Sequence, residues 1–200
     1  MRASLADQDH GRTRQLAAAV SQALVRPDTL AIALGANLPS RAGSPADTLL
    51  TLRPLLEHAL QQWQLWQLWQ QAPLRFHWSP LLETAPVGGP AGQSNYVNGA
   101  LLVEGCRLLC EPSCSGAPQA QAALALLQAL QQLEAQFGRP PQSKRQHWGP
   151  RSLDLDLLWW GDLELDLPAT SATPALQLPH PLWRERLFVL EPLMSLISAG

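Results

Sequence analysis

Residues 153–157 read Leu-Asp-Leu-Asp-Leu, and this strict alternation of apolar and acidic side chains constrains the fold more than any other segment. Successive side chains of a β-strand point to opposite faces, so a strand here directs the leucines to one face and Asp154 and Asp156 to the other. The leucines can anchor in a core, and the two carboxylates then lie side by side. We therefore predict a strand over residues 153–160 whose polar face carries a carboxylate pair.

Apolar periodicity predicts the elements around this strand. Apolar runs bounded by Gly and Pro predict strands at residues 30–37, 76–89, 94–105 and 153–160, and the second run is expected to break at Pro86. Apolar side chains at helical spacing predict helices at residues 46–71 and 120–138, followed by an amphipathic C-terminal segment at 182–197. This order predicts an α+β fold, a ferredoxin-like β-α-β-β-α-β sandwich with an antiparallel sheet, two helices on one face and a C-terminal extension.

The first 29 residues are weakly patterned and are expected to be an N-terminal extension, either helical at residues 15–25 or frayed. Residues 30–200 suffice for one domain with its own core. The net charge of −2 argues against a general nucleic-acid or anionic-membrane binder, which carries a basic excess. No apolar run approaches the roughly eighteen residues of a spanning helix, and no secretory signal is recognisable, so a cytoplasmic protein is expected.

Two further rows of residues have an ordinary structural interpretation. Three cysteines recur four positions apart: Cys106, Cys110 and Cys114. Zinc requires four ligands in tighter pairs, so free thiols in a reducing cytoplasm are expected. Three tryptophans recur three positions apart in a Gln-rich stretch: Trp63, Trp66 and Trp69. For these tryptophans, packing against the core together with a surface patch is favoured over an aromatic ligand-binding face.

Basic residues gather beside the aspartate pair. Four of them fall within thirteen positions: Arg139, Lys144, Arg145 and Arg151. Adjacent carboxylates repel each other unless positive charge lies nearby, and these basic residues can supply it. The alternative interpretation is that the two aspartates simply lie on a solvated face of the strand. A cationic Gly/Pro loop next to two carboxylates suits a metal-bound polyphosphate, because Mg²⁺ prefers one or two carboxylates together with phosphate oxygens, and arginine forks bind phosphate. The chain has no P-loop motif.

Four blocks of sequence occur in a family-specific order: IALGANL (32–38), ETAPVGGPAGQSNYVNGAL (83–101), LEAQFGR through WGPRSLDLDLL (133–158) and LPHPLWRERLFVLEPL (178–193). Through these blocks the chain resembles the 6-hydroxymethyl-7,8-dihydropterin pyrophosphokinase family of folate biosynthesis. The resemblance implies transfer of pyrophosphate from ATP to the hydroxymethyl group of the dihydropterin, with release of AMP. It also implies two Mg²⁺ ions held by Asp154 and Asp156.

The resemblance assigns the other site residues by position. The arginines that contact phosphate, taken as catalytic, are Arg139 and Arg151. The pterin-binding residues are Thr84, Val87, Tyr96, Asn98, Trp148 and Phe188. The nucleotide-binding residues are Gln131, Glu134, Leu157, His180 and Arg186. Tyr96 and Asn98 are two apart in a predicted strand and so share a face, which suits a flat heterocycle with a polar edge.

One departure and two rival functions follow from the same residues. Pro141 stands where the family has a second loop arginine, and either Lys144 or Arg145 is its replacement. A metal-dependent nucleotidyl- or glycosyltransferase also uses Asp-x-Asp, but its usual α/β architecture disagrees with the predicted element order. A non-enzymatic ferredoxin-like RNA-binding module needs a basic surface, which the net charge does not favour. We therefore expect ATP and a dihydropterin as substrates, and no nucleic-acid, membrane or obligate protein partner.

Overall fold

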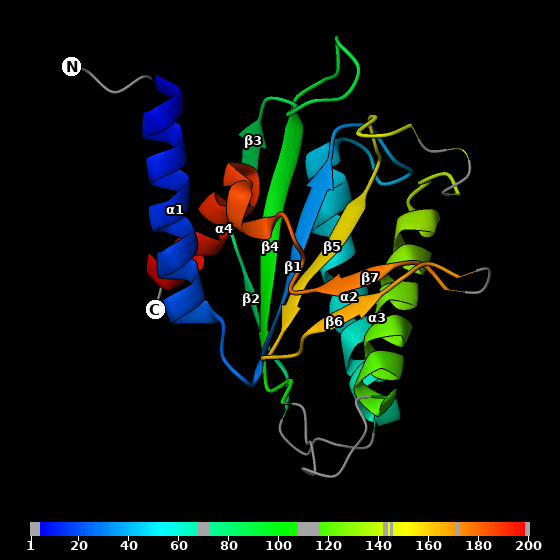
Figure 1. The fold of residues 1–200 in the computed structure, drawn as a ribbon. Helices are drawn as coiled ribbons and strands as arrows, with labels where there is room; N and C mark the ends of the chain where they lie inside the picture. Colours follow the sequence, from blue (N-terminus) through cyan, green and yellow to red (C-terminus); the bar gives the residue numbers. More distant parts are fainter. Residues whose placement is uncertain are drawn as a thin grey trace.

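The computed structural model describes residues 5–67, 73–107, 117–141, 144, 146–170 and 173–198 (Figure 1). The helices are α1 (Leu5–Leu24), α2 (Pro45–Gln67), α3 (Ala117–Gln136), the short 3₁₀ helix η2 (Trp183–Glu185) and α4 (Leu187–Ser198). The strands are β1 (Thr29–Ala36), β2 (Arg75–Trp78), β3 (Leu82–Thr84), β4 (Tyr96–Glu104), β5 (Asp154–Trp160), β6 (Leu165–Leu167) and β7 (Leu176–Leu178).

The main sheet is antiparallel and has the order β2-β4-β1-β5. Strand β3 also pairs with β4, beyond the end of β2, and β6 pairs with β7 in a separate two-stranded sheet. The central strand β1 is buried at every position, as expected for a strand covered on both faces. The predicted α+β class and antiparallel sheet are therefore confirmed.

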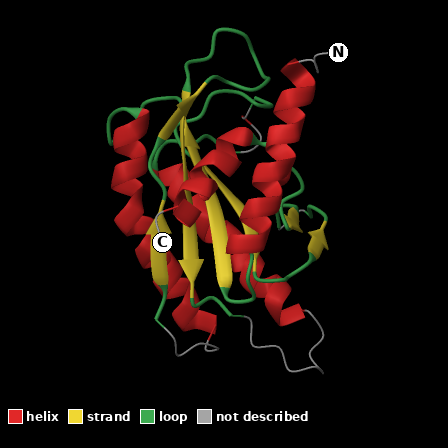
Figure 2. Ribbon diagram, turned by 90° about the vertical axis from the view of Figure 1, so that its left-hand side faces the viewer, coloured by secondary structure: helices red, strands yellow, loops and turns green. Residues whose placement is uncertain are grey.

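Helices cover both faces of this sheet. One core joins α2 and α3 to alternate β1 residues such as Leu30 and Ile32, whereas the residues between them, Ala31 and Ala33, pack with α1 and α4 (Figures 1 and 2). The small alanines leave room for a second helix layer close to the sheet. The expectation of helices on one face was therefore incomplete, because the terminal helices bury the other face.

The segment predicted as one strand over residues 76–89 is two strands, and it breaks earlier than Pro86. The break falls at Ser79 and Pro80, between β2 and β3. Ser79 still bonds to Ala100 of β4, because its N–H donates to the Ala100 carbonyl and its hydroxyl accepts from the Ala100 N–H, both at 2.9 Å. Pro80 has no N–H to donate, so the regular pairing stops there.

The N-terminal segment forms a longer helix than the predicted 15–25. Helix α1 buries Ala17, Val20 and Leu24 against the α4 side of the sheet, and Arg12 forms a 2.6 Å ion pair with Glu191. Within the residues that the structure describes, no helix is both long and apolar enough to cross a membrane.

Part of the cysteine and tryptophan rows can be followed. Cys106 is a buried free thiol, and burial raises its pKa to about 12. The Trp63 indole N–H donates to the Ala122 carbonyl at 2.9 Å, and its ring meets Trp160 edge-on with centroids 4.8 Å apart. Trp63 is thus a core residue, as expected. Cys110, Cys114, Trp69 and the Trp66 side chain lie outside the described residues.

Candidate active site

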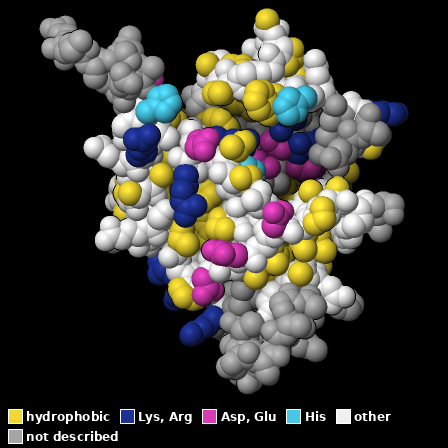
Figure 3. All heavy atoms as spheres, viewed as in Figure 1, with side chains coloured by type: hydrophobic (Ala, Val, Ile, Leu, Met, Phe, Trp, Pro, Cys, Tyr) yellow, Lys and Arg dark blue, Asp and Glu magenta, His cyan; other side chains and the backbone are white. Residues whose placement is uncertain are grey.

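The carboxylate pair lies on β5 as the alternation predicted. Asp154 and Asp156 are partly exposed, whereas the flanking Leu153, Leu155 and Leu157 are buried. Asp156 pairs with Ala33 across the sheet, so both aspartates lie on the face that α1 and α4 cover elsewhere. Figure 3 shows acidic and basic side chains together in a hollow of the molecule.

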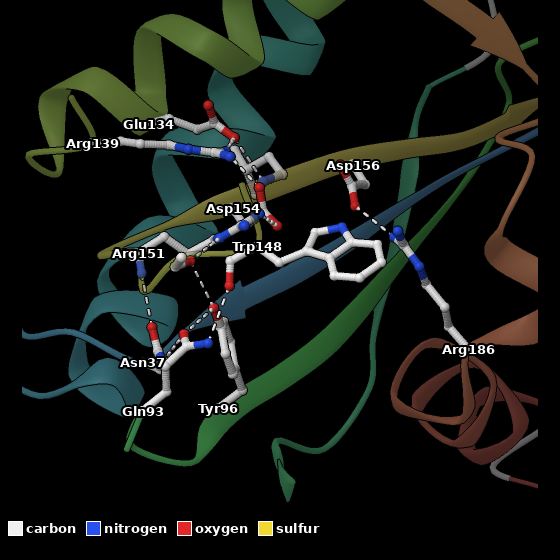
Figure 4. Close-up of polar contacts among 12 residues, drawn as sticks. Asn37, Gln93, Tyr96, Glu134, Arg139, Trp148, Arg151, Asp154, Asp156 and Arg186 are labelled. Atoms are coloured by element: carbon white, nitrogen blue, oxygen red, sulfur yellow. Dashed lines mark hydrogen bonds and ion pairs between the residues drawn. The ribbon is translucent and has the colours of Figure 1, made fainter. Parts of the chain in front are cut away.

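Three arginines approach the two aspartates from opposite sides (Figure 4). Arg151 Nη1 lies 2.6 Å from Asp154 Oδ2, and Arg139 Nη1 lies 2.5 Å from Asp154 Oδ1. Arg186, just before α4, reaches Asp156 Oδ2 at 3.4 Å. Both oxygens of Asp154 are thus compensated by arginine, whereas Asp156 has one longer arginine contact among the residues that the structure describes.

The electrostatics reflect this difference. Burial and the neighbouring Asp154 charge raise the pKa of Asp156, although the three arginines oppose the shift. Burial disfavours the charge on Arg151, but the Asp154 carboxylate outweighs it and raises the Arg151 pKa. Asp156 therefore carries the less compensated negative charge of the pair.

A cross-strand row joins the aspartates to the predicted pterin residues. Gly35 of β1 pairs with Asn98 of β4 on one side and with Asp154 of β5 on the other. A Cβ atom at Gly35 would lie 3.2 Å from Asn98 Oδ1, 3.8 Å from Tyr96 Cδ1 and 4.0 Å from Asp154 Cβ. Gly35 therefore forms a floor between the two groups of side chains. Residues directly opposite in antiparallel strands share a face, so this row lines one surface.

Hydrogen bonds orient the side chains on the β4 side of the row. The Asn98 amide donates to Thr84 Oγ1 at 2.8 Å, and the Tyr96 hydroxyl donates to the Gly149 carbonyl at 3.1 Å. Burial raises the Tyr96 pKa, so the hydroxyl stays protonated. The ring of Tyr96 and the amide of Asn98 are thus held on the same face of the sheet.

Trp148 brings a second loop onto this side of the site. It has a positive φ of 50°, and its side chain is half exposed. Its carbonyl accepts from Gln93 Nε2 at 3.1 Å, and its indole lies against Gly88. The loop after β3 and the loop before β5 therefore meet at Trp148.

Three residues of the site were not predicted from the sequence: Gly35, Asn37 and Gln93. The buried Asn37 accepts the Arg151 N–H at 2.8 Å and donates to the Ser94 carbonyl at 3.1 Å. Asn37, which also contacts Gln93, thus links Arg151 to the loop before β4. All three lie inside the quoted family blocks, which was the available signal.

The remaining predicted residues lie around this centre with fewer contacts. Val87 is 75% exposed, whereas the Leu157 side chain is buried in the core and is not available to a ligand. Phe188 is partly buried, and the Arg186 guanidinium carbon lies 5.7 Å from its ring centroid. Gln131 lies three residues before Glu134 on α3, and so on the same side of that helix.

His180 is tied to β5 through its backbone. Its N–H donates to the Leu158 carbonyl at 2.7 Å, and its Nδ1 accepts from Leu182 N at 3.2 Å. Burial and the charge of Arg186 lower the His180 pKa to about 4, so the ring is neutral near pH 7. Of the two candidate replacements for the missing loop arginine, Lys144 is exposed and Arg145 lies outside the described residues.

The residues that the structure describes contain no group of three or more His, Cys, Asp and Glu side chains able to hold a metal. Among the described residues the site therefore offers two carboxylates, Asp154 and Asp156, to which a substrate or water could add further ligands.

The chain is similar to known proteins over most of its length. Residues 31–198 match the family model described as 7,8-dihydro-6-hydroxymethylpterin-pyrophosphokinase. Three relatives carry the name 2-amino-4-hydroxy-6-hydroxymethyldihydropteridine pyrophosphokinase. The Pseudomonas aeruginosa protein is 39% identical over 59% of this chain, and those from Synechocystis and Bacillus subtilis are 44% and 39% identical over 36% of it. These matches cover 58%, 32% and 37% of the relatives' own lengths.

Proposed function

Because this chain belongs to the 7,8-dihydro-6-hydroxymethylpterin-pyrophosphokinase family, we propose that it transfers pyrophosphate from ATP to the hydroxymethyl group of 6-hydroxymethyl-7,8-dihydropterin in folate biosynthesis. The observation that carries the proposal is the row Asn98–Gly35–Asp154. Neighbouring strands lie about 4.8 Å apart, so this row spans roughly 10 Å. That span suits a flat heterocycle at one end and its reacting hydroxymethyl oxygen near the carboxylates.

Tyr96 and Asn98 are the proposed core of the pterin subsite. The Tyr96 ring would stack on the heterocycle, with Phe188 as the second plate, and the Asn98–Thr84 pair would bond its polar edge. Val87 and Trp148 would close the subsite from the loops. An open floor at Gly35 supports this arrangement, since any larger residue would project between Asn98 and Asp154.

The donor set at Asp154 and Asp156 fits Mg²⁺. Mg²⁺ is commonly bound by one or two carboxylates plus substrate phosphates and waters, and the part of the chain that the structure describes offers such a carboxylate pair. The raised pKa of Asp156 also supports cation binding there, because its negative charge lacks full compensation by arginine. We propose that Asp154 and Asp156 hold two Mg²⁺ ions, which when bound supply charge that neutralises phosphate oxygens.

In the proposed reaction the hydroxymethyl oxygen attacks the β-phosphorus of ATP. The bond from that phosphorus to the oxygen bridging the α-phosphate breaks, the hydroxyl proton is released, and AMP leaves. Catalysis of such a transfer is mostly positioning and charge stabilisation. Arg139 and Arg151 would exchange Asp154 for phosphate oxygens, where arginine forms strong charge-assisted hydrogen bonds.

The nucleotide is proposed to contact Gln131, Leu157 through its backbone, His180 and Arg186. The low pKa of His180 supports a neutral hydrogen-bonding role beside the cationic Arg186.

We further propose that the strand order β2-β4-β1-β5 is that of a ferredoxin-like sandwich and that residues 30–200 form one pyrophosphokinase domain after an extension over residues 1–29. The proposed binding partners are ATP and the dihydropterin, with no nucleic acid and no obligate protein partner. We also propose that the enzyme is cytoplasmic.

A thermal-shift experiment separates this function from its rivals, because a ligand that binds the folded state raises the melting temperature. A non-hydrolysable ATP analogue, the dihydropterin and Mg²⁺ together should raise it well above any effect of RNA or a sugar nucleotide. Stabilisation by RNA or a sugar nucleotide, with none from the dihydropterin set, would overturn the proposal.

A further inference from the structure

Glu134 is a buried acidic residue near the end of α3 with a relative exposure of 2%. Its Oε1 accepts the Leu155 backbone N–H at 2.9 Å and also contacts Arg139 Nη1. Arg139 in turn contacts Asp154 (Figure 4). These partners belong to the proposed phosphate site, so Glu134 is connected to the chemistry although little of it reaches the surface.

The Glu134 carboxylate accepts a hydrogen bond from the backbone N–H of Leu155, the residue between the two aspartates. Within the described part of the chain, β5 is an edge strand of the main sheet and pairs with β1 on one side. The Leu155 N–H bonds to Glu134 instead of to a strand. A buried N–H without an acceptor is costly, so a carboxylate at this position stabilises the strand segment that carries Asp154 and Asp156.

The contact with Arg139 fixes an arginine that lies after the end of the helix. Gly138 has a φ of 88° and ends α3, and the Arg139 N–H donates to the Glu134 carbonyl at 3.0 Å. Glu134 therefore holds Arg139 through both its backbone and its side chain. A buried carboxylate is tolerated when positive charge compensates it, and Arg139 supplies such charge at direct contact.

We propose that Glu134 is a positioning residue, which aims Arg139 and holds the Asp154–Asp156 strand segment, and does not contact the nucleotide directly. With 3% of its side chain exposed, it presents almost no surface to a ligand. The inference rests on the proposed function for its kinetic consequences, whereas the link between Glu134 and Arg139 can be tested without catalysis.

A double-mutant cycle tests that link. Glu134→Gln keeps an acceptor for Leu155 but removes the charge, and Arg139→Ala removes the partner. In the wild-type background Glu134→Gln should lower the melting temperature. In the Arg139→Ala background Glu134→Gln should lower the melting temperature less, or raise it, because the buried carboxylate has already lost the Arg139 contact. Equal shifts in both backgrounds would overturn the link, whether or not the enzyme is active.

Kinetics test positioning against direct contact. Glu134→Gln should lower kcat by about tenfold or more, since small misplacement of a catalytic group is costly. The Kd of an ATP analogue, measured by calorimetry, should stay within roughly threefold of the wild-type value if Glu134 does not bind ATP. In the Arg139→Ala background the kcat effect should largely disappear. A large rise in Kd with unchanged kcat would instead establish a nucleotide contact and overturn the proposal.

Gln132→Ala is the matched control, because Gln132 lies exposed on the same turns of α3 and should leave melting and kinetics unchanged. If Glu134→Gln alone does not fold, the double variant decides the link: it should fold and melt near the temperature of Arg139→Ala, and its failure to fold would overturn the link. Wild-type protein without AMP release would sink the proposed function, while the melting cycle would still report on Glu134.

Discussion

The backbone of Gly88 packs so closely against the indole of Trp148 that a Cβ atom at residue 88 would lie 2.7 Å from Trp148 Cε3. Gly88 also has a φ of 74°, which disfavours other residues. The contact holds the loop after β3 against the loop before β5, beside the proposed pterin subsite. Trp148 is therefore positioned by a residue that contributes no side chain.

Gly88→Ala should weaken dihydropterin binding by displacing Trp148. Gly92→Ala is a matched control, since Gly92 has a similar φ of 78° but nothing within 4 Å of a Cβ. Gly88 and Gly92 have similar positive φ angles, so the difference between the two alanine variants isolates the clash with Trp148; overpacking of this kind typically costs about 1–3 kcal/mol of folding stability. Calorimetry with the dihydropterin measures how far the displaced Trp148 lowers the affinity, and equal affinities in the two variants would contradict the role given to Trp148.

Tyr96→Ala should weaken dihydropterin binding by about 1–3 kcal/mol, the scale for losing one stacking plate, and leave ATP-analogue binding intact. Tyr96→Phe keeps the ring and loses the hydroxyl bond to Gly149, so it should retain most of the affinity. Separate titrations with each ligand check both. A Tyr96→Ala protein that loses the nucleotide but keeps the pterin would show that the two subsites are wrongly divided.

Asp156→Asn should stabilise the metal-free protein at neutral pH and lose that advantage in acid. The Asp156 pKa rises from 3.8 to about 6 on folding, so the folded state holds a proton that the unfolded state releases. The contribution of Asp156 to the free energy of unfolding of the wild-type protein therefore falls as the pH rises from about 4 to 6. Asparagine does not titrate.

The measurement is the melting temperature of both proteins from pH 4 to 8 in chelator. The melting temperature of Asp156→Asn minus that of the wild type should increase from about pH 4 to 6 and then level off. A difference that is independent of pH would contradict the unfavourable ionisation of Asp156 in the folded protein.

Sequence patterns predicted the strand and the helices that form the core on one face of the main sheet. The alternation at 153–157 predicted β5 and the orientation of Asp154 and Asp156, and helical spacing predicted α2 and α3. Strands β6 and β7 have three residues each, too few to show a period of two. The second helix layer was missed because it depends on small residues such as Ala31 and Ala33, which give only a weak burial signal.

The site was predicted as residues and not as an arrangement. Local pattern and family resemblance proposed the aspartates, the arginines and Tyr96 as site residues. They could not show that Gly35 lies between Asn98 and Asp154, because strand register is set by pairing between distant segments. The bond from Leu155 to Glu134 likewise depends on how the end of α3 packs beside an edge strand.

The most direct test of the account is the nucleotide product formed from ATP with Mg²⁺, in the presence and absence of 6-hydroxymethyl-7,8-dihydropterin. We predict AMP, formed only with the dihydropterin and in equal amount to its pyrophosphorylated product. Asp154→Asn and Asp156→Asn should each slow AMP formation by roughly a hundredfold or more, the scale for removing one preorganised charge contact. Formation of ADP, AMP release that does not require the pterin, or a fully active Asp156→Asn protein would contradict it.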